Sequence, residues 1–320
     1  MAGKDAYNKK IIKRINNIIA NNPDKSYLKG FLAFLSEMSY SSLYTYLTYT
    51  VNFLNYINKD IKDIDFDDYT NYMFLLKDKS PSYQKVSHGA LKKFSEYLYV
   101  SGKVEKDYMS FVKRPKAKET QITKDKREKN YLTENEIKEY LNNVTGYECS
   151  IGEEWKARNI VIVYILLTTG MRCSALYKVD IDDIDLKNKT ITVTDKGDKV
   201  ITYYITEELD TYLTEWLDYR KDIVEERERA LLISEFKGRM SQSAISRVVE
   251  KYGEGIKGKK LSPHKLRATY GTQLYNATKD IIFVQKAMNH SSSRTTELYI
   301  RGKRDESKIR AADIMAKLTN

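Results

Sequence analysis

The chain has 320 residues, a hydrophobic fraction of 41% and a formal net charge of +11. This length exceeds that of a usual single domain and predicts two, and the excess of Lys and Arg favours a polyanionic partner, either nucleic acid or an anionic membrane. The most apolar run, "IVIVYILL" at 160–167, is far shorter than the roughly 20 residues that span a bilayer, so nucleic acid is the expected partner.

Apolar residues spaced three and four apart predict helices in the first part of the chain. Residues 41–57 place Leu43, Leu47 and Leu54 on one face, and residues 82–99 repeat the pattern after a Ser-Pro pair that suits a helix start. The predicted helices span residues 27–38, 41–57, 66–77 and 82–99, in a domain at 27–112 that follows an N-terminal extension at 1–26. Its many Tyr and Lys residues fit either a DNA-binding face or ordinary solvated surfaces.

Residues 113–131, "KRPKAKETQITKDKREKNY", are strongly charged without apolar periodicity, as expected of an exposed linker. The second domain, 132–302, opens with Thr133 and Glu136 at the spacing of a capping box, and a buried helix is expected at 157–169. Two alternating apolar runs on either side of a glycine-containing turn then predict a β-hairpin, with Ile191, Val193, Ile201, Tyr203 and Ile205 on one face. This domain is therefore expected to be helical with one small antiparallel sheet.

The segment "LSPHKLRATYGTQL" at 261–274 has the features of a phosphate site at a helix start. Ser262 can cap the helix, Pro263 suits its first position, and His264 and Arg267 then lie three residues apart near the positive end of the helix dipole. An HxxR pair by itself also fits an ordinary surface or core role.

The segment "TTGMRCSAL" at 168–176 places a second arginine at the end of the buried helix. Gly170 suits the helix end, and Arg172 follows from a rigid support, able to grip a phosphate with two hydrogen bonds. Lys196, in the turn of the hairpin, is by spacing alone no more than an ordinary solvated lysine.

A histidine and a tyrosine close the series of candidate residues. His290 follows a predicted helix and Tyr299 lies nine positions later in "HSSSRTTELYIRG", in a second short helix that Ser293 can cap. The chain has only 3 His but 26 Tyr, so capping and packing would be the ordinary roles of these two residues. Their significance comes from the ordered set Arg172, Lys196, His264, Arg267, His290, Tyr299.

That set resembles the tyrosine recombinase family of phage integrase and Xer-like enzymes. The matching segments are "TTGMRCSALYKVDIDDIDL", "TDKGDK", "HKLRATYGTQL" and "MNHSSSRTTELYI". One departure is Ala175, where the family usually has an acidic residue, and it raises the question of how Arg172 is held. The resemblance implies a mainly α, two-domain chain, with an N-terminal four-helix SAM-like core-binding domain and a C-terminal α+β catalytic domain.

The resemblance also implies a metal-free reaction without cofactors. Tyr299 would attack a DNA phosphodiester to form a 3′-phosphotyrosyl link, with Arg172, Arg267 and His290 as donors to the phosphate. Lys196 is the candidate general acid for the leaving 5′-oxygen, and His264 is the candidate base for the tyrosine proton.

The expected partners are double-stranded DNA recombination sites, other copies of the chain in a synaptic homo-tetramer and an accessory DNA-bending protein, with no membrane. The tail at 303–320 offers an apolar stripe that could dock on a neighbouring protomer or pack on its own domain. Two cysteines and the absence of a secretory signal in the N-terminal sequence favour a cytoplasmic, nucleoid-associated protein.

Four functions compete. Integration or excision of a mobile element is favoured, and a Xer-like dimer resolvase is the next candidate. A type IB topoisomerase-like enzyme shares the catalytic residue types but reseals the same strand, and a non-catalytic DNA-binding protein of the same fold is the fourth. A zinc enzyme is disfavoured because His264, His290 and Cys173 lack local ligand spacing.

Overall fold

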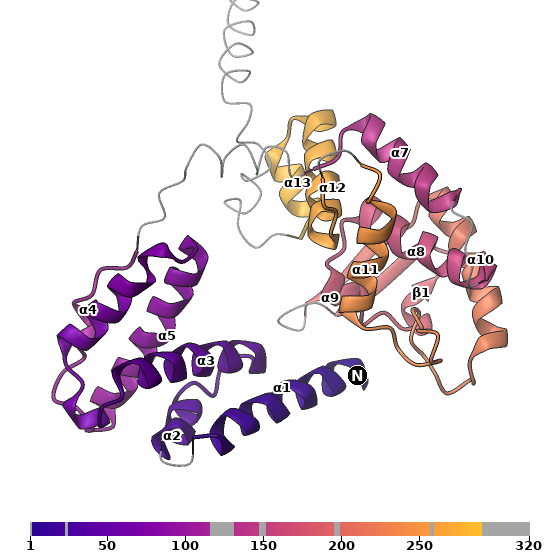
Figure 1. The fold of residues 1–320 in the computed structure, drawn as a ribbon. Coiled ribbons are helices and arrows are strands. Elements are labelled where there is room, and N and C mark those ends of the chain that lie inside the picture. The colour runs from indigo at the N-terminus through magenta and orange to yellow at the C-terminus, as the bar shows by residue number, and fades with distance from the viewer. Residues whose placement is uncertain are drawn as a thin grey trace, which may run out of the picture. The chain divides into compact units, whose positions relative to one another are not determined.

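A computed structural model describes residues 2–22, 25–115, 131–146, 152–194, 199–256 and 259–289 (Figure 1). Residues 2–7 are described by their backbone alone. The chain divides into two compact units, residues 1–120 and 121–320. Each unit has its own hydrophobic core. The described residues are mainly helical with one small antiparallel sheet, which confirms the predicted fold class.

The first unit is a bundle of helices joined by short turns. Its helices are α1 (Ala2–Ala20), α2 (Tyr27–Phe34), α3 (Tyr40–Ile57), α4 (Phe66–Leu75) and α5 (Pro81–Val100), with 3-10 turns at Ile61–Asp63, Leu76–Asp78 and Tyr108–Ser110. The four predicted helices are all present. α1 is an addition, since residues 1–26 are expected only as an extension; α1 packs on α3 and buries Ile11 and Ile15.

Side-chain caps explain where these helices begin. Ser39 accepts a hydrogen bond from the backbone N–H of Ser42 at the start of α3. Ser80 accepts from the backbone N–H of Tyr83 at the start of α5. The first residue of α5 is Pro81, and proline suits this position because the first residues of a helix have no hydrogen-bond partner for an N–H within the helix. Each of these boundaries is therefore set by local sequence.

Aromatic rings fill the core of the first unit. Phe31 meets Phe94 edge to face at 5.2 Å between centroids, and Phe53 stacks on Tyr69 at 4.7 Å. These rings come from α2, α3, α4 and α5, so aromatic contacts join most of the bundle.

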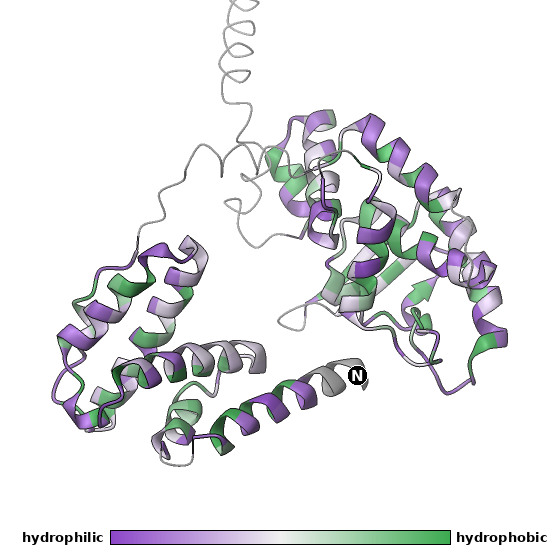
Figure 2. Ribbon diagram, in the orientation of Figure 1, coloured by the Kyte–Doolittle hydropathy of each residue, from purple (hydrophilic) through white to green (hydrophobic). Residues whose placement is uncertain are grey.

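The second unit is built around one buried helix. Its elements are α7 (Glu134–Thr145), α8 (Glu153–Thr169), α9 (Cys173–Leu176), β1 (Ile184–Asp185), β2 (Thr190–Thr194), β3 (Val200–Tyr204), α10 (Glu207–Ile223), α11 (Gln242–Tyr252), α12 (Pro263–Thr278) and α13 (Ile281–Ala287). α8 packs against α7, α10, α11 and α12. Its buried residues cover most of its circumference, and it is more hydrophobic than the surface helix α7 (Figure 2).

The sheet contains the predicted hairpin. β2 and β3 pair antiparallel, with Ile191 opposite Tyr203 and Val193 opposite Ile201, and all four side chains are buried. The short strand β1 pairs with β2 and was not part of the predicted hairpin. Among the described residues, no helix combines the length and the apolar character needed to cross a membrane.

Candidate active site

The first turn of α12 carries two of the predicted site residues. The hydroxyl of Ser262 accepts a hydrogen bond from the backbone N–H of Lys265 at 3.4 Å, and Pro263 is the first helical residue. His264 is exposed, whereas Arg267, three residues on, is only 4% exposed. The two side chains therefore leave the same turn into different surroundings.

The guanidinium of Arg267 joins three segments that are distant in sequence. Nη1 donates to the carbonyl of Gly170, and Nη2 donates to the carbonyl of Met288 at 2.5 Å. Gly170 lies two residues before Arg172, and Met288 lies two residues before His290. A guanidinium remains charged even when buried, so Arg267 brings a fixed positive charge to the point where these segments meet.

Arg172 emerges directly after the end of α8. Gly170 ends that helix in the left-handed conformation, with a φ of 63°, and the backbone N–H of Met171 donates to the hydroxyl of Thr169 at 3.1 Å. The carbonyl of Arg172 accepts from the N–H of Leu176 at 3.0 Å, and the Arg172 side chain is half-buried. A well-defined turn thus fixes the start of this side chain.

Close packing with α12 explains why residue 170 is glycine. A Cβ added there would lie 2.3 Å from the ring of Tyr270. Burial raises the pKa of Tyr270, while the nearby Arg267 acts in the opposite direction. The end of α8 and the helix that carries Arg267 are therefore in direct contact.

The structure shows where Ala175 lies and what holds the chain beyond it. Ala175 is fully buried in the core, in α9, where an acidic side chain would have to be desolvated. The chain that follows is held instead by Arg239, which donates to the carbonyls of Tyr177 at 2.9 Å and Val179 at 3.3 Å and pairs with Asp180. Arg239 is absent from the sequence-predicted set, because no local pattern marks a residue whose partners lie some 60 positions away.

α9, which follows Arg172 in the chain, also contacts the start of α11. The Cys173 sulfur lies 3.9 Å from the carbonyl oxygen of Gln242. Burial raises the pKa of the Cys173 thiol, against an opposing hydrogen bond with Ser246. Cys173 is thus a packed residue next to Arg172.

Three predicted site residues, Lys196, His290 and Tyr299, lie outside the described residues. The strand register places Thr194 opposite Val200, immediately before and after the segment that contains Lys196. Within the described ranges, no cluster of three or more His, Cys, Asp or Glu residues could hold a metal ion.

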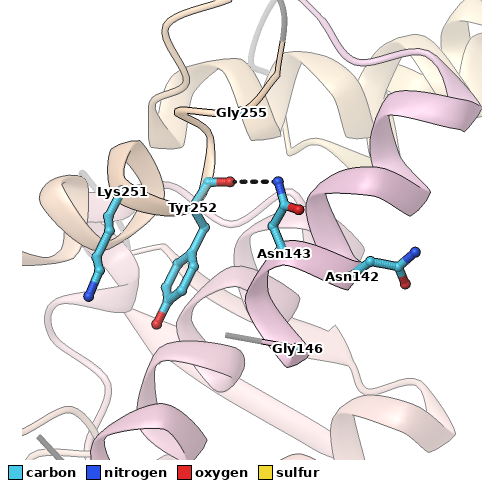
Figure 3. A pocket seen from close by; sticks show the side chains of 6 residues that line it. All are labelled: Asn142, Asn143, Gly146, Lys251, Tyr252 and Gly255. Carbon is cyan, nitrogen blue, oxygen red and sulfur yellow. Dashed lines mark hydrogen bonds between the residues drawn. The ribbon is translucent and has the colours of Figure 1, made fainter. Parts of the chain in front are cut away.

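A hollow elsewhere on the second unit contains none of the predicted site residues (Figure 3). It is lined by Asn142, Asn143, Gly146, Lys251, Tyr252 and Gly255. The Asn143 amide donates to the carbonyl of Tyr252 at 3.3 Å and so joins α7 to the end of α11. This bond connects two helices and shares no residue with the hydrogen bonds of Arg267.

Known proteins resemble both the sequence and the fold. Residues 130–306 match the model of the phage integrase family. Tyrosine recombinase XerS of Streptococcus agalactiae is 34% identical over 175 residues, which cover 53% of this chain and 49% of the relative. The chain spans about half the length of the curated relatives that it matches.

Two solved structures share the fold across most of the chain. XerH site-specific recombinase bound to a palindromic difH substrate has a TM-score of 0.74 at 22% identity, covering 94% of this chain and 88% of that one. A lambda integrase dimer bound to a COC' core site has a TM-score of 0.64 at 15% identity, covering 86% and 76%. The family model covers more than half of the chain, and the resemblance found in the sequence is confirmed: this chain belongs to the phage integrase family.

Proposed function

We propose that this chain is a site-specific DNA recombinase that cleaves and rejoins strands through a 3′-phosphotyrosyl intermediate. The observation that carries the proposal is the pair of hydrogen bonds from buried Arg267 to Gly170 and Met288. They hold the segment before Arg172 and the segment before His290 against one helix. The family membership and the recombinase names of XerS and XerH support the same activity.

In the proposed site, fixed cations stabilise the charge that develops on the phosphate. Arg172 and Arg267 supply permanent positive charge, and His290 is a further donor. Phosphoryl transfer is mainly a matter of position and charge, so donors fixed by the fold before DNA arrives are what the reaction requires.

The proposed cleavage step forms one bond and breaks one. The Tyr299 oxygen attacks phosphorus, the bond from phosphorus to the 5′-oxygen breaks, and its electron pair leaves on that oxygen. Lys196 donates a proton to the leaving oxygen, and His264 accepts the tyrosine proton. Attack by a partner strand's 5′-hydroxyl reverses the step, so the energy of the phosphodiester is kept and no ATP or other cofactor is consumed.

We assign DNA binding to both parts of the chain, residues 27–112 as the core-binding domain and residues 132–302 as the catalytic domain. The formal charge of +11 suits phosphate contacts, and affinity should fall with salt with a log–log slope of about −0.9 per neutralised phosphate. Four protomers on two sites, tail docking between them and an accessory bending protein complete the proposal.

We favour a role in integration or excision of a mobile element. A Xer-like dimer resolvase is the second candidate, because XerS and XerH are among the similar proteins. The two roles require the same strand chemistry and differ in the DNA sites that are recombined.

Covalent capture tests the proposed chemistry. Wild type and Tyr299→Phe are mixed with fragmented DNA of the source genome, denatured in detergent, and the DNA that stays attached is sequenced, with nicked traps present to prevent resealing. We expect a defined site with wild type and none with Tyr299→Phe. Release of all DNA from both proteins would contradict the proposal and favour a non-catalytic binding protein. The genomic position of a recovered site separates a mobile element from a dimer resolvase.

A further inference from the structure

Residues 131–133, called the entry segment below, are held by an unusually complete set of hydrogen bonds. Lys259 Nζ donates to the carbonyl of Tyr131 at 2.7 Å, the N–H of Leu132 donates to the Thr269 hydroxyl at 2.9 Å, and Gln273 Nε2 donates to the carbonyl of Leu132 at 2.9 Å. Leu132 and Thr269 are fully buried. Side chains therefore satisfy the backbone N–H and carbonyl groups of this segment, as a neighbouring strand does in a sheet.

The next residue completes the attachment. The N–H of Thr133 donates to Glu136 at 2.7 Å in the capping box of α7, and the same carboxylate pairs with Lys259 at 2.5 Å. Hydrogen bonds fix a position along the chain, whereas apolar contacts alone would allow a segment to slide. The entry segment is thereby fixed to α12 and to Lys259, which precedes α12 in the chain.

α12 carries its two sets of contacts on different faces. At about 100° per residue, Thr269 lies about 200° and Gln273 about 240° around the helix from Arg267, while His264 lies about 60° from it. Arg267 reaches Gly170 and Met288, and Thr269 and Gln273 reach the entry segment. One helix thus carries both the bonds to the entry segment and the turn with His264 and Arg267.

We propose that Thr269 and Gln273 are positioning residues that couple the end of the linker to the catalytic turn of α12. The proposal rests on the proposed function. In the proposed function both domains bind DNA, and the linker at 113–131 that joins them in sequence leads into the entry segment. The hydrogen bonds join the entry segment to α12, so the catalytic turn takes its working position when both domains are engaged.

The test compares single-turnover cleavage at saturating protein with DNA binding, in full-length protein. Gln273→Met keeps length and removes the amide, and Asn143→Leu is the matched control, since Asn143 also donates from its amide to a distant carbonyl, that of Tyr252 (Figure 3). We expect Gln273→Met to cleave about 10-fold more slowly at unchanged affinity, because small misplacements of catalytic groups are costly, and Asn143→Leu to change less than about 2-fold. Equal cleavage by the two variants overturns the inference.

A second pair guards against a folding defect. Thr269→Val removes the hydroxyl that accepts from Leu132, whereas Thr269→Ser keeps it. Cleavage should fall with valine and return with serine at closely similar melting temperatures. Loss with both variants at native melting temperature contradicts a role for the hydroxyl.

Lengthening the linker separates coupling from simple support. A flexible Gly-Ser insertion between residues 121 and 122 should uncouple the linker from α12. Gln273→Met should then slow cleavage much less than it does with the native linker, so that the two changes are non-additive in a double-mutant cycle. An undiminished cost overturns the coupling. If wild type itself cleaves no DNA, the proposed function fails and the inference with it; if wild type cleaves and the cycle is additive, the inference fails alone.

Discussion

The two units differ in how they treat buried polar groups. In the second unit, buried Arg158 donates to the carbonyl of Ile233 at 2.9 Å, buried Arg220 donates to that of Ala230 at 2.8 Å, and Arg267 binds two carbonyls. In the described part of the first unit no arginine is buried, and the core is rich in packed aromatic rings such as Phe31, Phe53 and Phe94.

This difference separates two kinds of order. A buried guanidinium loses its hydration and must recover it from directed bonds, which then fix the loops that supply the carbonyls. Aromatic packing is less directional and tolerates small shifts of one helix against another. Directed bonds from buried arginines therefore fix loops in the second unit, whereas the core of the first unit rests more on ring packing.

Arg267→Lys should give the largest effect. Lysine keeps the charge but cannot reach two carbonyls with a planar fork, and one buried carbonyl left without a donor costs about 1–3 kcal/mol of stability. We expect cleavage to fall about 1,000-fold in a single-turnover assay, as for loss of a fixed transition-state donor.

The matched control is Arg220→Lys, which removes a buried arginine bonded to the carbonyls of Ala230 and Glu228, outside the candidate site. It should lose similar stability in urea unfolding but less than about 10-fold in cleavage, because its partners carry no predicted site residue. Similar cleavage losses in both variants would show that Arg267 acts only through the fold.

Phe94→Ala should have the next largest effect, on the first unit. The fully buried ring packs against Phe31 and Tyr97, and truncation of such a residue costs about 3–5 kcal/mol. Urea unfolding should show this loss and leave the transition of the second unit in place. Phe74→Ala, at a ring that is 66% exposed, is the control and should stay within about 0.5 kcal/mol.

Gly170→Ala and Gly102→Ala compare one strained position in each unit. Both glycines have positive φ, 63° and 66°, so each alanine should cost about 1–2 kcal/mol in the backbone. A Cβ at residue 102 meets nothing within 4 Å, whereas one at residue 170 meets the Tyr270 ring. Thermal unfolding should therefore show a larger loss for Gly170→Ala, partly restored by Tyr270→Ala. Equal losses would mean that the ring moves aside freely.

Local signals predicted most of the fold. The Ser-Pro starts of α5 and α12 and the Thr133–Glu136 capping box lie within a few residues of the boundaries that they set, and the alternation around residues 191–205 gave the hairpin. α1 carries apolar residues at Ile11 and Ile15, one helical turn apart, but their burial depends on α3, which no local pattern reveals.

Less of the candidate site could be predicted. The residue types of Arg172, His264 and Arg267 and their order are visible in the sequence. The bonds of Arg267, the support from Arg239 and the bonds that hold Tyr131 and Leu132 are not, because each joins residues from 21 to 141 positions apart. Such partners are chosen by the assembled fold.

The two carbonyls bound by Arg267 have a consequence for the protein during its synthesis. Gly170 and Met288 stand 97 and 21 positions from Arg267, on opposite sides of it along the chain. During synthesis Gly170 leaves the ribosome well before Arg267, and Met288 leaves after it. An unfinished chain therefore lacks the arrangement that the proposed chemistry needs. The proposed strand cleavage therefore becomes possible only after the segment that contains Met288 has been made.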